Sequence, residues 1–389
     1  MTGARECESV AEVGIVCSRE DRQGSWKQQK LGALLSLEYG ASLPEETRTP
    51  GDCPVYGSNG RVGWHSEKLV DGPGIVVGRK GSVGEVTWVD TDFWPIDTTY
   101  FVKPKTDKSL RWLYYLLKSR DIRRLNAATG VPGLNRNDAH ALKVGVPPNG
   151  ETHRIAEILF SVDTAIERTR AVIEQVRVVK QALLAKLMTN GLPGRRCRLT
   201  SVRLGEVFAE RKEPGRSGLP VVSVTIDNGL VRRGSLDRRV DSDLRPEQHL
   251  LARKGDIAYN MMRMWQGVSG IAEEDCLISP AYVVCRPLDG IVPEFAAYFL
   301  KHPQTVRLLH RHSQGVADDR LRLYFHHLAS IRVKLPPLPI QRDVARMLAS
   351  VDKRIAASVE HLKQLDKGKR GLLEQLLTGR IRVVKENRK

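Results

Sequence analysis

Residues 78–84, with the sequence GRKGSVG, combine glycines, two cations and a hydroxyl, which are the residue types of a phosphate-binding loop. The spacing differs from G-x-x-x-x-G-K-[ST], which places a lysine and a hydroxyl on a bound nucleotide, so we interpret the stretch as a strand and turn carrying two cations. The sequence has no G-x-S-x-G or H-E-x-x-H motif and no carboxylate pair in an acid/base context. Asp318-Asp319 is typical of a turn. The sequence therefore favours binding over catalysis.

The cysteines do not form a metal-binding pattern. There is no C-x-x-C pair, and no histidine lies at the spacing of a metal ligand. We expect all of them to be reduced and structural, with no metal site. They are Cys7, Cys17, Cys53, Cys197, Cys276 and Cys285.

Side chains suited to DNA cluster in the predicted loops. Arginine and lysine can pair with guanine, asparagine and glutamine with adenine, and aromatic residues and methionine supply apolar contacts. The methionine-rich run at 261–264 is equally compatible with a core strand. The candidates in the first half are Tyr56, Ser58, Asn59, Arg61, Trp64, His65, Arg79, Lys80, Asn135, Arg136 and Asn137. Those in the second half are Asn260, Met261, Met262, Arg263, Met264, Trp265, Gln266, Arg320, Arg322, Tyr324 and His326.

These candidates belong to two predicted globular segments, residues 31–146 and 204–335. In the first, short apolar runs broken by glycine and Asn-Gly turns predict strands, with helices before and after them. The predicted elements are a short helix at 31–35, strands at 55–60, 74–84 and 98–102, a helix at 110–125, a glycine-rich loop at 130–138 and a strand at 142–146.

The second globular segment repeats this plan loosely. Leu204-Gly205 corresponds to Leu31-Gly32, and the offset drifts along the chain, so insertions have accumulated. Further correspondences link residues 282–284 with 100–102, 298–301 with 115–118, and 315–316 with 130–131. Similar scaffolds with different loops can read two different targets.

Residues 147–190 and 336–379 are two copies of one helical unit, aligned at a constant offset without a gap. Each begins with a double proline, and Gly191 and Gly379 suit the helix ends. Apolar residues recur at steps of four and three, as in a coiled-coil seam, and predict helices of roughly 36 residues and about 54 Å. We expect the two seams to bury each other; two unrelated core helices are the alternative. The seam positions are Ile155, Leu159, Val162, Ile166, Ile173, Val176, Leu183, Leu187, Val344, Leu348, Val351, Ile355, Leu362, Leu365, Leu372 and Leu376.

Both seams are interrupted at the same two places. A small hydroxyl residue stands at Thr169 and Ser358, and a lysine at Lys180 and Lys369. The two copies therefore share one register.

The 389 residues carry a formal net charge of +17, which favours a polyanionic partner. Most of the excess lies on the helical repeats and the segments after them; solvated tails that only keep the protein in solution are the alternative. A hydrophobic content of 41% suffices for two or three packed domains. Without a long apolar run or signal segment, we expect a soluble, cytoplasmic protein that does not enter membranes.

The order of globular segment, long helix, globular segment, long helix resembles the specificity subunit of type I restriction-modification systems. The helices share the heading P-P-x-x-E/Q-x-x-I/V-A-x-x-L-x-x-V-D, and the second ends L-L-x-x-L-L-T-G. Phrases at 56–60, 133–136 and 257–267 also resemble that family's target recognition domains. The likeness covers about residues 31–380. Two small departures are Asn190, where the second copy has Gly379, and Glu151, where it has Gln341.

The resemblance implies a mixed α+β fold. Two similar α/β target recognition domains would be separated by two long antiparallel coiled-coil helices, with a pseudo-twofold internal repeat. The implied divisions are an N-terminal arm (1–30), target domain 1 (31–146), spacer helix 1 (147–191), a basic linker (192–203), target domain 2 (204–335), spacer helix 2 (336–380) and a basic tail (381–389).

The resemblance also implies a non-catalytic subunit that binds double-stranded DNA. Each target domain would read one half of a bipartite, asymmetric site, with the helices setting the spacer. Two modification subunits would carry S-adenosylmethionine and methylate adenine, and two restriction subunits would use ATP and magnesium, with no cofactor in this chain. A scaffold that binds only proteins, and a stand-alone nuclease or methyltransferase, remain as alternatives. The recognised bases and the spacer length do not follow from the sequence.

Overall fold

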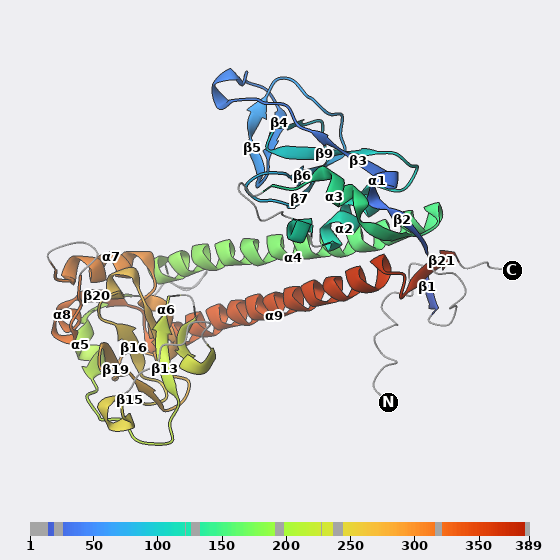
Figure 1. Ribbon diagram of the computed structural model, residues 1–389. Coiled ribbons are helices and arrows are strands. Elements are labelled where there is room, and N and C mark those ends of the chain that lie inside the picture. Colours follow the sequence, from blue (N-terminus) through green and yellow to red (C-terminus); the bar gives the residue numbers. More distant parts are fainter. Residues whose placement is uncertain are drawn as a thin grey trace. The chain divides into compact units, whose positions relative to one another are not determined.

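The computed structural model describes residues 15–18, 26–120, 122–125, 133–190, 198–226, 228–235, 244–315 and 321–385. The chain divides into two compact units (Figure 1). The first unit contains residues up to Arg170 and from Glu360 onward, and the second contains Ala171–Val359. Each unit therefore holds one globular part and a portion of both long helices.

Two antiparallel-rich sheets form the globular part of the first unit. A four-stranded sheet has the order β3-β9-β6-β7, and a three-stranded sheet has the order β5-β4-β8, in which β4 and β8 are parallel. The strands are β3 (Leu35–Tyr39), β4 (Cys53–Gly57), β5 (Gly60–His65), β6 (Gly74–Gly78), β7 (Val86–Val89), β8 (Trp94–Pro95) and β9 (Thr99–Pro104).

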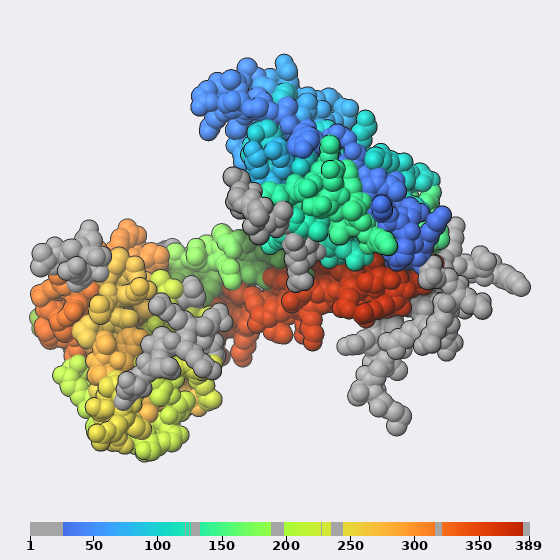
Figure 2. Space-filling model, in the orientation of Figure 1, coloured from blue at the N-terminus to red at the C-terminus, as the bar shows by residue number. Residues whose placement is uncertain are grey.

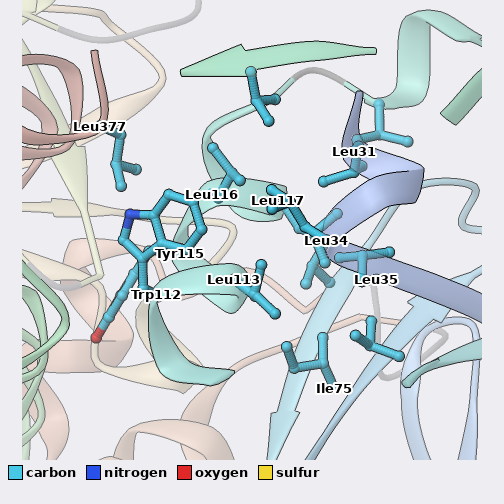
Figure 3. Packing of buried hydrophobic residues seen from close by; sticks show 14 of the residues in the cluster. Leu31, Leu34, Leu35, Ile75, Trp112, Leu113, Tyr115, Leu116, Leu117 and Leu377 are labelled. Carbon is cyan, nitrogen blue, oxygen red and sulfur yellow. The ribbon is translucent and has the colours of Figure 1, made fainter. Parts of the chain in front are cut away.

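Helix α2 (Leu110–Ser119) supplies much of the core of the first unit. The Ser109 side chain caps its start by accepting from the Trp112 amide, and the inward face buries Trp112 together with its apolar neighbours. Figure 3 shows this face packed with α1 (Leu31–Leu34) and with Leu377 from the end of α9. In Figure 2 the same end of α9, in red, lies against the blue and green surface of its unit.

The predicted helix at 110–125 is too long. The backbone turns extended at Arg120, and residues Ile122–Leu125 form a separate 3₁₀ turn, η3. This break lets Ile122 reach the core, where it is buried. The predicted loop at 130–138 is also wrong at its end, because helix α3 begins at Arg136 and runs to Ala141. Residues 130–132 lie outside the described residues.

The second unit has two four-stranded sheets, ordered β12-β19-β16-β17 and β14-β13-β18-β15. Its strands are β12 (Phe208–Glu210), β13 (Val221–Thr225), β14 (Gly229–Arg232), β15 (Leu250–Ala252), β16 (Ile257–Asn260), β17 (Ser269–Ile271), β18 (Cys276–Ile278) and β19 (Tyr282–Pro287). Its short helices are α5 (Leu204–Val207), α6 (Pro293–Phe299), α7 (Pro303–His312) and α8 (Phe325–Ser330).

The strand registers show how the two globular parts correspond. In the first unit Leu35, which follows α1, pairs with Pro104, and in the second Phe208, which follows α5, pairs with Pro287. This register aligns Thr99 with Tyr282, one residue away from the expected partner Tyr100. The sequence comparison was wrong there because matching tyrosines concealed the shift.

Three further two-stranded antiparallel pairs flank the sheets. Strand β2 (Lys27–Lys30) pairs with β10 (Lys143–Val146), β11 (Thr200–Arg203) with β20 (Arg332–Leu335), and β1 (Ile15–Ser18) with β21 (Arg382–Lys385). Part of the predicted N-terminal arm is thus strand, and Trp26 joins the core. Part of the predicted basic tail is strand as well.

The long helices are α4 (Asn149–Asn190) and α9 (Leu338–Leu377), with 42 and 40 residues. In the first unit the start of α4 packs with the end of α9, and in the second the end of α4 packs with the start of α9, so the pair is antiparallel. All the predicted seam residues are buried or half-buried. Gly379, with φ +73, suits the turn after α9. The predicted fold class is confirmed: a mixed fold with two like globular parts and a long helix pair.

The lysines that interrupt the seam are paired with aspartates of the opposite helix. In the second unit Lys180 contacts Asp352 at 2.5 Å, and Asp352 also accepts from the Tyr298 hydroxyl at 2.7 Å. In the first unit, Asp163 pairs with Lys369 and accepts from the Tyr115 hydroxyl at 2.8 Å. Burial and the aspartate bond raise the pKa of both tyrosines, which therefore stay protonated as donors.

Glu151 and Gln341 stand at equivalent positions with different partners. Glu151, 2% exposed, receives two bonds of 2.9 Å from the Arg382 guanidinium and one of 3.0 Å from the Val383 amide. Gln341 accepts from the Val292 amide and donates to two backbone carbonyls. The first position requires a carboxylate because a cation faces it, whereas the second faces only backbone groups.

Among the described residues, no helix combines the length and the apolar character needed to cross a membrane.

Replacing Tyr115 with phenylalanine is expected to lower the free energy of unfolding of the first unit by about 1–2 kcal/mol, because Asp163 loses one hydrogen bond. Chemical denaturation followed by tryptophan fluorescence measures this, since all six tryptophans except Trp265 lie in the first unit. The control is Tyr56→Phe, which removes the hydroxyl of a half-buried tyrosine on strand β4 of the same unit and should change stability little. An equal effect of both variants would contradict the role of the Tyr115–Asp163 bond.

Arg382→Met should destabilise the first unit more strongly, by about 3 kcal/mol, because it leaves the buried Glu151 carboxylate without its cation. Adding Glu151→Gln removes that unpaired charge and should restore most of the loss. The same fluorescence assay compares the single and double variants. A double variant no more stable than Arg382→Met would show that the ion pair does not account for the effect.

Candidate nucleic-acid interface

Five predicted DNA-contacting residues of the first unit gather around one shallow cavity of about 390 Å³. Arg79 and Lys80 follow strand β6, whereas residues 135–137 lie at the start of helix α3. The Leu134 amide joins the two segments by donating to the Arg79 carbonyl at 2.9 Å. Residues distant in sequence thereby share one surface. The cavity is lined by Tyr39, Arg79, Lys80, Tyr100, Gly133, Leu134, Asn135, Arg136 and Asn137.

Tyr39 organises the two arginines of this cavity. Tyr39 is 51% exposed, and the guanidinium carbons of Arg79 and Arg136 lie 4.9 and 5.2 Å from its ring centroid. Arg79 also donates to the Asp97 carbonyl at 2.9 Å. Such cation–π contacts hold a guanidinium in a defined plane while leaving most of its donors available.

Sequence reasoning missed Tyr39 and Tyr100. Tyr39 ends a strand in which Leu35 and Leu37 are buried, so the alternation suggests a third core residue. Tyr100 is buried and donates to the Leu134 carbonyl at 3.0 Å, and burial, followed by the neighbouring Tyr39, raises its pKa to about 12. It therefore holds the cavity wall rather than facing a ligand.

Asn135 has a structural role, because asparagine is a favourable residue at the start of a helix. Its side-chain oxygen accepts from the Asn137 amide at 2.9 Å and caps the start of α3. The cap orients Arg136 over Tyr39 and leaves Asn137 exposed. Asn135 thus positions the neighbouring candidates.

A second group lies on the hairpin of β4 and β5. Tyr56, Arg61 and Trp64 line one hollow, and the Arg61 guanidinium lies 4.6 Å from the ring of Trp64, which is 48% exposed. Asn59 is exposed at the turn, where the Ser58 hydroxyl donates to the Thr98 carbonyl at 2.7 Å. The hairpin therefore presents an aromatic ring and a cation together.

His65 is not on this surface. It is buried, and its Nδ1 accepts from the Thr49 amide at 3.1 Å. Its ring packs edge-on against Trp94.

In the second unit the methionine-rich run forms a turn, so its interpretation as a core strand is wrong. Asn260 accepts from the Met262 amide at 2.9 Å, and the turn leads into the 3₁₀ helix η6 (Met264–Gln266). Met264 is buried and anchors it, whereas Met262 is 48% exposed. The Trp265 indole donates to the Met262 carbonyl at 3.0 Å, and Arg263 and Gln266 are exposed.

A second segment joins this turn. The Leu323 amide donates to the Met261 carbonyl at 2.9 Å, which brings Arg322 and Tyr324 beside the turn. Tyr324 is half-exposed, and its ring stacks on that of His326 with centroids 5.9 Å apart. The predicted contact Arg320 lies outside the described residues.

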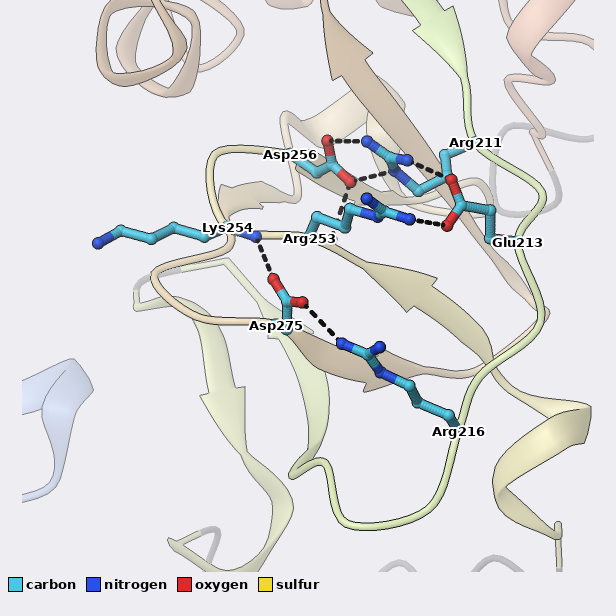
Figure 4. Close-up of polar contacts among 7 residues, drawn as sticks. All are labelled: Arg211, Glu213, Arg216, Arg253, Lys254, Asp256 and Asp275. Atoms are coloured by element: carbon cyan, nitrogen blue, oxygen red, sulfur yellow. Dashed lines mark hydrogen bonds and ion pairs between the residues drawn. The ribbon is translucent and has the colours of Figure 1, made fainter.

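Several basic residues of the second unit are already paired with acids (Figure 4). Arg211 binds the buried Asp256 through two nitrogens, at 2.5 and 3.2 Å, and Asp256 first, then Glu213, raises its pKa. Arg253 contacts Glu213 at 2.8 Å and Arg216 contacts Asp275 at 3.2 Å. This network joins the ends of several strands. Because acidic side chains already balance the charge of these arginines, we expect them to contribute little to DNA binding.

In the described ranges, no three histidine, cysteine or acidic side chains gather where they could hold a metal ion. The described cysteines Cys53, Cys276 and Cys285 are free thiols, and burial raises the pKa of each. The geometry of both units suits recognition by hydrogen bonds and aromatic contacts.

Residues 23–177 and 226–367 match the family model described as the type I restriction modification DNA specificity domain. The MjaVIII type I restriction enzyme specificity subunit of Methanocaldococcus jannaschii is 25% identical over 304 residues, which cover 70% of each protein.

Two solved structures share the fold. An S subunit of a type I restriction-modification system from M. genitalium covers 92% of this chain and 97% of its own, with a TM-score of 0.64 and 19% identity. A chain from a study of complex assembly and conformational transition in the type I R-M system covers 92% and 98%, with a TM-score of 0.51 and 16% identity. Because the family model matches most of the chain in both units, this protein belongs to the family of type I restriction-modification specificity subunits.

Proposed function

We propose that this chain reads a bipartite, asymmetric DNA site, one half with each globular part, and that it performs no catalysis itself. One observation supports the proposal: the two globular parts share a backbone scaffold but carry different side chains on their candidate contact surfaces. Strand registers and the bonds Leu134–Arg79 and Leu323–Met261 align the two parts, yet their surfaces carry different residues. Arg79 and Arg136 lie beside Tyr39 in the first part, whereas the second combines a methionine-rich turn with Arg263 and Arg322. Like domains with different contact residues suit two different half-sites.

The helix pair would act as the ruler of this site. At 1.5 Å per residue, helices of 42 and 40 residues are about 60 Å long. Half-sites about 34 Å apart, one turn of DNA, fit beside rods of that length. Basic residues after each helix, apart from Arg380 and Arg382, which are paired with Glu374 and Glu151, would neutralise phosphates of the unread spacer, and this contribution falls with salt.

The helices would also dock partner subunits. Helix α4 exposes Val172 and Val179, which are seven residues apart and therefore on one face, with Val178 beside them, and such an apolar surface suits a partner protein. Two modification subunits would bind here, with S-adenosylmethionine for adenine methylation in their own sites. Two restriction subunits with ATP and magnesium would complete the complex.

Independent recognition of one half-site by each globular part predicts the result of a domain exchange. The chain is coexpressed with its modification subunits, and modified adenines are mapped by sequencing the host DNA. Exchanging residues 204–335 for those of another family member should change one half of the mapped motif and leave the other half intact. Changes in both halves would contradict independent reading, and a stable complex without any motif would favour a scaffold that binds only proteins.

If the length of the helix pair sets the spacer between the half-sites, deleting one heptad from each helix has a predictable result. Removing residues 168–174 and 357–363, which are equivalent in the two copies, shortens each helix by about 10 Å and preserves the seam. The spacer of the mapped motif should shorten by about three base pairs, or binding should be lost. Deleting only one heptad misaligns the seams and serves as the control that disrupts folding. A paired deletion that binds with an unchanged spacer would refute the ruler.

A further inference from the structure

We propose that the first unit reads guanine with Arg79 and Arg136, which Tyr39 holds in place, and that the second unit lacks this contact at the equivalent surface. The inference rests on the proposed function and deepens it, because it assigns base chemistry to one half of the site.

Geometry distinguishes the two arginines from ordinary surface cations. Both guanidinium groups lie over the ring of Tyr39. Arg79 also donates to the Asp97 carbonyl at 2.9 Å, and Arg136 makes a longer contact of 3.5 Å with the Leu37 carbonyl. Contact with a phosphate requires mainly charge, whereas reading a base edge requires a guanidinium with a fixed direction. The bracing supplies that direction.

Guanine is the base that this chemistry fits. It presents two acceptors, O6 and N7, to the major groove, and the arginine fork donates to both at once. The cavity beside the arginines is open to solvent and bordered by the exposed Lys80 and Asn137, so a base edge can approach. Adenine offers a donor at N6 where guanine has O6, and an arginine discriminates against it.

The second unit replaces each part of this arrangement. Counting from the equivalent amides of Leu134 and Leu323, Met261 corresponds to Arg79 and Phe325 to Arg136. Both replacements pack partly against the core of the second unit. Lys212 corresponds to Tyr39 and contacts Glu210 at 2.9 Å. At the two arginine positions the scaffold thus offers donors in the first unit and apolar side chains in the second, which suit the methyl group of thymine. The exposed Arg263 and Arg322 of the second unit stand at other positions of that surface.

The test removes single acceptors from the DNA. After the motif is mapped and its halves assigned by domain exchange, each guanine of the first unit's half is replaced by 7-deazaguanine, which lacks N7. Affinity of the chain bound to its modification subunits is measured at fixed salt. One replacement should weaken binding by about ten-fold. In Arg79→Lys or Arg136→Lys, which keep the charge but not the fork, the same replacement should cost little further.

Three variants control this measurement. Arg123→Lys makes the same change outside the cavity and should keep the full 7-deazaguanine penalty. Tyr39→Phe keeps the ring and should keep guanine discrimination, whereas Tyr39→Ala should reduce it several-fold with little effect on non-specific DNA binding.

The outcomes separate the inference from the proposed function. A bipartite motif whose first half lacks guanine, or tolerates 7-deazaguanine, overturns the inference and leaves the function standing. Lysine variants that weaken all DNA sequences equally and keep the penalty would assign the arginines to phosphates, which also overturns it. A complex that modifies no motif overturns both.

Discussion

One carboxylate on each long helix determines how the elements of its unit fit together. Asp163 and Asp352 occupy equivalent positions, and each accepts a hydrogen bond from a tyrosine of the globular part and an ion pair from a lysine of the opposite helix. A lysine inside an otherwise apolar seam would be costly to bury without a partner. The aspartate compensates that charge and, through the tyrosine, orients the globular part on the helix pair. The surfaces that face DNA in the proposed function depend on this orientation.

The two copies differ where their surroundings differ. At the head of the helices, Glu151 meets Arg382 from the strand that follows α9, while Gln341 meets backbone groups alone. A carboxylate at the second position would lack a cation, and an amide at the first would leave one buried. The candidate contact surfaces differ in the same way. Arg79 and Met261 occupy equivalent backbone positions, but one side chain is a cation and the other is apolar. A repeated fold therefore tolerates asymmetry wherever each side chain has its own partners, and an asymmetric DNA site is the expected consequence.

Sequence patterns predicted the larger elements and failed at local breaks. The short helix at Leu31, the two long helices and most strand runs are present because their apolar spacing has a clear period. The strand expected at 74–84 ends at Gly78, because Gly81 and Gly84 adopt positive φ angles in the turn that follows. The helix expected at 110–125 ends early because the buried Ile122 favours a tighter turn over a continued helix. Asn135 and Asn137 were chosen as base readers by residue type, yet Asn135 caps a helix. Tyr39 carried no signal at all, since alternation along its strand predicts burial, and it is exposed.

Sequence by itself determined the repeat, the register of both helices and the resemblance to the specificity-subunit family, since periodicity and motif spacing are local properties of the chain. Only the tertiary structure decided which side chains share a surface. Tyr39, Arg79 and Arg136 come from three separate segments. Pairing of β3, β9 and β6 brings Tyr39 and Arg79 to one cavity, and the bond from the Leu134 amide to the Arg79 carbonyl adds Arg136. Strand register and loop packing are set by contacts between distant residues, and a one-residue shift, such as that between Tyr100 and Tyr282, changes which residues correspond.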